Sequence, residues 1–346
     1  MATEILGALR QLERERGIAV HDLVDALEVA LVSAYRKHSG AQDNVRVQFD
    51  QETGAIRVLS RREVVSSPED PKTQISLLEA QERDPRLGEG DFVEEEIPAK
   101  GFGRIAAQTA KQVVLQKLRE KERDMIYDEF AEREGDVVTG QIVRVERGVV
   151  TVDLGRIEGY ILPQEQIRGE RYKERDRVKA YVLEVRRTPK GPHILLSRTH
   201  PGLLKRLFEL EVPEIRDGVV EIRGMAREAG MRSKVAVRAV IPEVDPLGAC
   251  VGLRGSRVQA ISQELRGERI DVIQWSDDPA EFVASALNPA KVLSVDVSPD
   301  ERIARVTVAD QQLSLAIGRD GQNARLAARL TGLKVDIKSE RDTRGT

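Results

Sequence analysis

Two Gly-x-x-Gly motifs contain the residues of this sequence that are best suited to binding chemistry. The motifs consist of Gly252, Leu253, Arg254 and Gly255 in the first case, and Gly318, Arg319, Asp320 and Gly321 in the second. Because glycine lacks a side chain, such a segment turns tightly and leaves room for a sugar-phosphate strand beside its backbone amides. A helix that begins directly after the motif points its free N–H groups and its positive dipole end at the same phosphates. Both motifs are therefore candidate phosphate-binding loops.

The side chains beside the two motifs differ in charge. Arg257 adds a second arginine to the first motif, whereas Gln322 and Asn323 follow the second motif and can donate hydrogen bonds. Asp320 lies inside the second motif, where a carboxylate repels phosphate. We expect both loops to bind a phosphate backbone and the second loop to bind it more weakly.

The two motifs belong to an internal repeat. A lone Gly-x-x-Gly is more often an ordinary turn or helix cap than a binding site, and that structural interpretation stays open for each loop. Here residues 251–273 align with residues 317–337, and each copy follows two predicted strands, at 219–225 and 235–241 or at 291–297 and 303–308. The repeated order is helix, strand, strand, helix, Gly-x-x-Gly, helix, strand. It resembles two tandem KH domains of the type II, prokaryotic topology, in which this loop clamps about four nucleotides of single-stranded RNA.

Five short β-type runs precede the repeat, at 137–145, 149–154, 159–162, 178–185 and 193–197. Strands of this length and spacing predict a small closed barrel, and the segment resembles an S1-type OB-fold that binds single-stranded RNA. That family usually carries aromatic residues on its binding face. Because Val149, Val150 and Pro163 stand in that neighbourhood here, we expect little base stacking on this barrel.

The first part of the chain is acidic and predicts helices with a β-hairpin. Apolar residues at helical spacing predict helices over 5–12 and 23–35, and alternating patterns predict strands at 44–50 and 55–65. A helix of about 30 residues, roughly 45 Å long, follows between 101 and 134 and is expected to bridge two domains. Arg104 and Lys111 share one face of it, either as an RNA contact or as an ordinary solvated face.

The order of these modules resembles the NusA family of bacterial transcription elongation, termination and antitermination factors. The resemblance rests on ALVSAYRK (30–37), GFGRIAAQTAKQV (101–113), DPLGACVG (245–252), QWSDDP (274–279) and LSLAIGRDGQNARLAARLTG (313–332). It implies an α+β protein of four modules, with boundaries expected at 1–132, 133–199, 200–276 and 277–346. It also implies docking of the first module on RNA polymerase near the RNA exit channel, binding of nascent RNA by the others, and cooperation with other antitermination factors.

Several classes of function are disfavoured by what the sequence lacks. Cys250 is the single cysteine, which excludes an intrachain disulfide, and no motif of a nucleotide-binding P-loop, zinc protease or serine hydrolase is present. We expect no enzymatic activity, cofactor or metal, and a cytoplasmic protein with no membrane contact. An RNA-processing enzyme and a ribosome-assembly or translation-associated RNA-binding protein are the alternatives.

A few further residues have two interpretations. Trp275 is expected to pack between modules rather than stack on bases, and Cys250 to be a small core residue rather than a nucleophile. Five basic residues surround the first hairpin of the repeat and either extend a basic path for RNA or simply keep that surface soluble: Arg223, Arg227, Arg232, Lys234 and Arg238.

Overall fold

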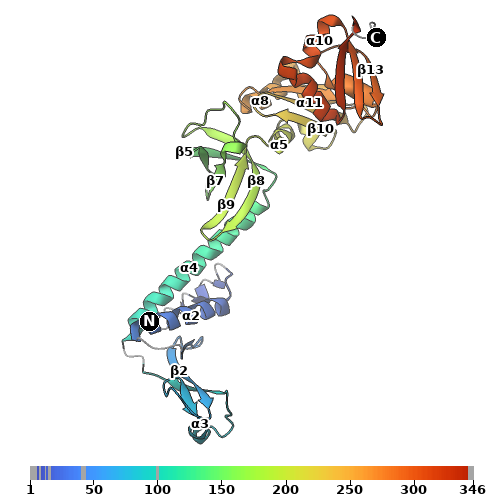
Figure 1. Ribbon diagram of the computed structural model, residues 1–346. Helices are drawn as coiled ribbons and strands as arrows, with labels where there is room; N and C mark the ends of the chain where they lie inside the picture. The colour runs from blue at the N-terminus through green and yellow to red at the C-terminus, as the bar shows by residue number, and fades with distance from the viewer. Residues whose placement is uncertain are drawn as a thin grey trace. The chain divides into compact units, whose positions relative to one another are not determined.

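The chain divides into two units. The computed structural model describes residues 6–7, 9–11, 13–14, 17–39, 44–98 and 101–341. Its internal contacts define one unit over Met1–Met125 and a second over Ile126–Thr346 (Figure 1). In the part of the chain that is described, no helix is long and apolar enough to cross a membrane.

The core of the first unit is formed by helix α2 (Val20–Ser39), the strands β1 (Val45–Phe49) and β2 (Ile56–Val65), and the beginning of helix α4 (Phe102–Ala131). Leu23, Leu27 and Leu31 recur at helical spacing on α2 and are fully buried. The predicted hairpin and second helix are confirmed. The helix predicted over 5–12 lies partly outside the described residues.

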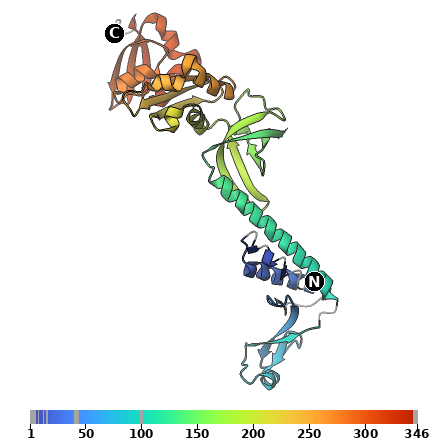
Figure 2. The same cartoon turned by 180° about the vertical axis from the view of Figure 1, so that it is seen from behind.

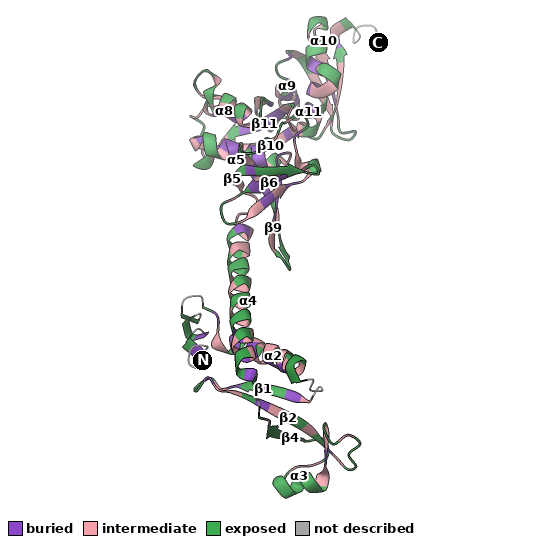
Figure 3. Cartoon of the chain, turned by 90° about the vertical axis from the view of Figure 1, so that its left-hand side faces the viewer, coloured by how far each residue is buried: buried purple, intermediate pink, exposed green. Residues whose placement is uncertain are grey.

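A smaller sheet extension lies beyond this core. Strand β3 (Gln74–Ser76) pairs parallel with β2, and β4 (Phe92–Glu96) pairs antiparallel with the same strand, with helix α3 (Leu77–Arg83) between them. Its apolar cluster contains four buried side chains, Val64, Ile75, Ala80 and Val93. Helix α3 is largely exposed (Figure 3). The sequence does not predict these elements, because each is too short to show a clear hydrophobic period.

Helix α4 has the predicted length of 30 residues. Phe102, Ala106 and Ala110 near its beginning are buried in the core of the first unit. Phe130 in its last turn is only 2% exposed and is buried in the core of the barrel. The long helix therefore contributes to both cores, as a helix between two domains must.

The second unit begins with the predicted five-stranded barrel. Its strands are β5 (Val137–Glu146), β6 (Val149–Asp153), β7 (Glu158–Ile161), β8 (Arg177–Thr188) and β9 (Gly191–Ser197). They close in the order β5-β6-β7-β9-β8, with a short 3-10 turn at Pro163–Glu165. Buried and exposed positions alternate along the first part of β8, so one face fills the barrel and the other faces outward.

Two repeated domains, called the KH units below, follow the barrel and share one sheet topology. The first contains α5 (Pro201–Glu211), α6 (Pro213–Arg216), β10 (Val220–Glu228), β11 (Arg232–Ala239), α7 (Pro246–Val251), α8 (Ser256–Glu264) and β12 (Arg269–Gln274). The second contains α9 (Pro279–Ala286), β13 (Val292–Ser298), β14 (Ile303–Val308), α10 (Asp310–Ile317), α11 (Gln322–Thr331) and β15 (Lys334–Ser339). In each sheet the first two strands are antiparallel and the third is parallel to the middle one. The predicted repeat and its KH topology are confirmed.

The two KH units pack against one another (Figure 2). Helix α11 lies against β10 and β11, and Glu228 at the end of β10 accepts hydrogen bonds from Arg325 Nε at 2.7 Å and Gln322 Nε2 at 2.9 Å. Lys234 on β11 is fully buried beneath the second unit. Its Nζ contacts Asp271 Oδ2 at 3.1 Å and the Asn288 carbonyl at 2.9 Å.

The buried ammonium of Lys234 makes stability depend on pH. Burial lowers its pKa to about 8, although Asp271 opposes the shift. Because an unfolded lysine titrates near pH ~10.4, the unfolded chain binds more protons between about pH 8 and 10, and the free energy of unfolding rises with pH there. Urea unfolding of the wild type and of Lys234→Met should give a stability difference that grows in favour of the wild type over this range. Any pH dependence that comes from Cys250 is common to the wild type and the variant and cancels in the difference. Parallel profiles of unfolding free energy against pH would therefore contradict the assignment of this dependence to Lys234.

Candidate nucleic-acid interface

The two Gly-x-x-Gly loops have the same backbone conformation. In the first loop, Gly252, Arg254 and Gly255 have φ angles of 75°, 52° and 80°. The corresponding residues of the second loop, Gly318, Asp320 and Gly321, have φ angles of 76°, 52° and 71°. Residues with a side chain rarely adopt this left-handed region. Agreement at these three positions means that the internal repeat extends to the conformation of the loops.

The two glycines of each loop have different surroundings. A Cβ atom on Gly252 would lie 2.8 Å from Arg257 Cγ, and one on Gly318 would lie 2.8 Å from Asn323 Cβ. The first glycine is therefore required by close packing against the following helix. A Cβ on Gly255 or Gly321 would meet nothing within 4 Å. The last glycine faces open space, where a strand can approach the backbone.

Loop side chains are strongly exposed. Leu253 is 85% exposed, and the side chains of Arg319 and Asp320 are 95% and 88% exposed. No side chain caps the start of α8 or α11, so the amides of each first turn are not claimed by a capping oxygen. Arg319 Nε lies 3.8 Å from Asp320 Oδ2, which partly neutralises the cation offered by the second loop. The first loop is thus the more positive, as the sequence predicts.

Three of the predicted contact residues make side-chain hydrogen bonds within the protein. Arg257 donates to Glu214 Oε2 at 2.8 Å and to the Ala249 carbonyl, so it holds the helices around the loop together. Gln322 donates to Glu228 of the other KH unit. Asn323 is fully buried, and its Nδ2 donates to the Leu287 carbonyl at 2.9 Å. Asn323 is therefore enclosed within the fold, which contradicts its predicted contact with RNA, whereas Arg257 and Gln322 are partly exposed side chains with partners inside the protein.

Of the five basic residues around the first hairpin, only some are exposed at the surface. Arg227 is 1% exposed and paired with the fully buried Glu268, and Arg232 is paired with Asp271. With the buried Lys234, these three cations are structural, because their charges are already neutralised or enclosed. Only Arg223 and Arg238 of the five face the surface, and their guanidinium carbons lie 4.9 and 5.0 Å from the centre of the Trp275 ring.

Trp275 lies where the two KH units meet. Its ring centre is 6.3 Å from that of Phe282 on α9, which agrees with the predicted packing role. Cys250 is fully buried, and burial raises the pKa of its thiol to about 12, so it is a core residue and not a nucleophile. Among the described residues, no group of three or more His, Cys, Asp and Glu is placed to hold a metal ion.

The barrel carries an aromatic pair that sequence reasoning missed. Tyr160 on β7 and His193 on β9 stack with ring centres 4.5 Å apart. Because β7 and β9 are parallel neighbours, their pairing is visible only after the barrel closes. Val150, one of the residues expected on the binding face, is fully buried in the barrel core. The expectation that little base stacking occurs on this barrel stays a prediction.

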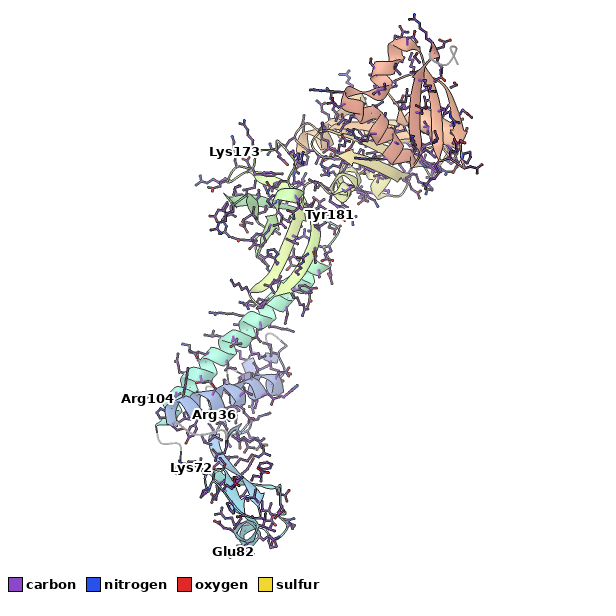
Figure 4. All side chains as sticks on the ribbon, viewed as in Figure 1. Arg36, Lys72, Glu82, Arg104, Lys173 and Tyr181 are labelled. Carbon is purple, nitrogen blue, oxygen red and sulfur yellow. The ribbon has the colours of Figure 1, made fainter. Side chains whose placement is uncertain are left out.

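Arg104 and Lys111 belong to the first unit, on the exposed surface of α4. Figure 4 shows Arg104 at the beginning of that helix. They lie on a different unit from both Gly-x-x-Gly loops.

Four family models match successive parts of the chain. They are the NusA N-terminal domain over residues 4–124, the S1 RNA binding domain over 132–196, the NusA-like first KH domain over 198–275 and the NusA-like second KH domain over 279–344. Together they cover nearly the whole chain in the predicted order.

Curated proteins match over almost their full length. The transcription termination/antitermination protein NusA of Bacillus subtilis is 55% identical over 344 residues, covering 99% of this chain and 93% of its own. The protein of the same name from Mycobacterium tuberculosis strain H37Rv is 46% identical, covering 97% and 93%. A solution structure of the N-terminal domain of NusA from B. subtilis is 50% identical and covers 36% of this chain and 99% of its own, with a TM-score of 0.32. The chain therefore belongs to the NusA family of transcription termination/antitermination proteins.

Proposed function

We propose that this protein binds nascent single-stranded RNA through its two Gly-x-x-Gly loops while its first unit docks on RNA polymerase near the RNA exit channel. The observation that carries the RNA-binding part is the shared left-handed loop whose last glycine faces open space, immediately before an uncapped helix. Such a loop accepts an extended sugar-phosphate strand, which a duplex does not present, so single strands are preferred. The contact residues are then Gly252, Leu253, Arg254 and Gly255, with Gly318, Arg319 and Gly321 in the second loop.

Docking on polymerase is inferred from the family and from the division of the chain into two units. The curated relatives are named for transcription termination and antitermination, which favours a transcription factor over a ribosome-associated protein. Tethering the first unit to polymerase raises the concentration of the RNA-binding unit around the transcript, so two loops of modest affinity suffice. Arg104 and Lys111, both exposed on α4, are proposed to meet RNA near the exit channel. We propose the same four modules as before, over residues 1–132, 133–199, 200–276 and 277–346.

Replacing the open glycines should weaken RNA binding. We expect Gly255→Asp and Gly321→Asp each to lower affinity for single-stranded RNA by roughly tenfold, because a carboxylate then faces the phosphates. Fluorescence anisotropy with a labelled single-stranded RNA measures the effect. Gly332→Asp is the matched control: Gly332 ends the same helix that Gly321 begins, and both have a φ angle of 71°. Equal affinities for the Gly321 and Gly332 variants would refute the clamp.

Removing the carboxylate of the second loop should strengthen binding. Asp320→Asn keeps a residue that tolerates the left-handed conformation and removes a like charge, so we expect RNA affinity to rise about two- to fivefold at low salt. The gain should shrink as salt screens the repulsion. Asp300→Asn, in the turn between β13 and β14, makes the same charge change away from the loop and should have no effect. A gain of equal size in both variants would show that only net charge matters.

Separating the two units tests the tether. The cut belongs before Ile126, because Ile126 and Tyr127 pack against the barrel and Phe130 is buried in it. The fragment 126–346 should keep RNA binding through both Gly-x-x-Gly loops, yet neither co-purify with RNA polymerase nor enhance pausing in a transcription assay. Undiminished pausing by this fragment would contradict docking through the first unit.

A further inference from the structure

An arginine on helix α11 joins the second Gly-x-x-Gly loop to the first KH unit. Arg325 donates from Nε to Glu228 Oε1 at 2.7 Å, across the junction between the KH units. The same guanidinium donates from Nη1 to the backbone carbonyl of Asp320, inside the loop, at 3.2 Å. Because a guanidinium is planar and holds its donors in a fixed fork, the position of the carboxylate sets the direction from which the carbonyl is bound. One side chain therefore connects the first KH unit with the backbone of the second loop.

Glu228 is well placed to hold this arginine. It is the last residue of β10, its side chain is 15% exposed, and both of its carboxylate oxygens accept hydrogen bonds. Gln322 Nε2 donates to its Oε2 at 2.9 Å. Hydrogen bonds from Arg325 and Gln322 outweigh burial and hold the pKa of Glu228 below its ordinary value. The carboxylate is therefore an ionised and largely enclosed anchor.

The bond to the Asp320 carbonyl fixes one peptide group of the loop at both of its ends. The carbonyl accepts from Arg325, and the N–H of the same peptide group, on Gly321, donates to the Gly318 carbonyl at 3.2 Å. This peptide group directly precedes the glycine that faces open space before α11. Because glycine adopts many backbone conformations, a peptide group held at its N–H alone has more freedom to rotate away from an RNA strand.

The first loop has the N–H bond without the arginine. The Gly255 amide donates to the Gly252 carbonyl at 3.1 Å, as in the second loop. The internal repeat places Gln259 at the position of Arg325, and this exposed side chain forms no hydrogen bond to the loop among the described residues. Support from the other KH unit is thus a property of the second loop.

We propose that Glu228 positions the second Gly-x-x-Gly loop for RNA binding by holding Arg325 against the loop backbone, so that the second clamp depends on its packing with the first KH unit. The inference rests on the proposed function. Glu228 is a positioning residue here and touches no RNA. The competing view is that Arg325, whose side chain is 44% exposed, binds phosphate itself. The two views predict opposite signs, because removing the carboxylate releases a cation for phosphate and also releases the loop.

Helix α11 supplies a matched control. Arg329, one turn after Arg325, lies 3.6 Å from the same oxygen of Glu228, and its side chain is 55% exposed. Within the described part of the chain, Arg329 makes no bond to the loop. Arg325→Lys and Arg329→Lys both keep the net charge, and each removes a guanidinium beside Glu228. Because a lysine ammonium cannot reproduce the fork that bridges a carboxylate and a carbonyl, only the first substitution breaks the link to the loop.

The experiment measures the affinity of the full chain for a single-stranded RNA of about eight nucleotides, given about four nucleotides per KH loop, by fluorescence anisotropy. We expect Glu228→Gln and Arg325→Lys each to weaken binding roughly three- to tenfold, the size of a typical net hydrogen bond, and Arg329→Lys to leave it unchanged. The loss from Glu228→Gln should vanish in a Gly321→Asp chain, whose second loop is already disabled, and persist in a Gly255→Asp chain. Unchanged emission of Trp275, the single tryptophan, verifies that the KH units still pack.

The outcomes separate this inference from the proposed function. Tighter RNA binding by Glu228→Gln would show that Arg325 binds phosphate directly and would overturn the inference. Equal losses from the two lysine substitutions would overturn it too, as would a loss from Glu228→Gln of the same size in both glycine variants. If Gly321→Asp weakens binding while Glu228→Gln and Arg325→Lys do not, the clamp stands and this inference fails. If Gly321→Asp has no effect either, the proposed function fails with it.

Discussion

The left-handed backbone of the Gly-x-x-Gly loops is the constraint on which the RNA interface depends. Three of the four residues in each loop have a positive φ angle, and one of the three is an arginine in the first loop and an aspartate in the second. The first glycine is required because the next helix packs against it, and the last leaves open space beside the loop backbone, where the proposed RNA strand lies. Since the conformation is the same with arginine or aspartate between the glycines, one backbone conformation serves loops of different local charge.

Buried charge pairs hold the second unit together at its joints. Arg198 pairs with Glu170 between barrel and first KH unit, Arg227 pairs with Glu268 beside the same linker, and Lys234 pairs with Asp271 beneath the second KH unit. An isolated charge in such a place would be costly, so each pair tolerates only a narrow set of arrangements. Arg227 also donates to the carbonyls of Arg198 and His200, which ties the first hairpin to the linker. The relative placement of the RNA-contacting surfaces within this unit is therefore specified by polar contacts as well as by apolar packing.

The division of the chain into two units agrees with the proposed division of tasks between polymerase docking and RNA binding. The first unit has its own core around α2 and the hairpin, and α4 leaves it to end in the barrel core. A factor that grips polymerase with one unit and RNA with the other benefits from this arrangement, because the RNA-binding surface stays near the transcript without a tight clamp.

The sequence by itself determined the modules, their order, the repeat and the location of both loops, because these depend on local periodicity, glycine placement and family motifs. It did not reveal which polar side chains were free. Asn323 and Arg257 look like RNA contacts in the sequence, but tertiary packing turns them inward to carbonyls and to Glu214. The Tyr160–His193 stack and the Arg198–Glu170 pair likewise join residues 33 and 28 positions apart, and only barrel closure and domain packing bring them together. Burial and pairing of a charged side chain are decided by what the rest of the chain places around it, and local sequence does not record that.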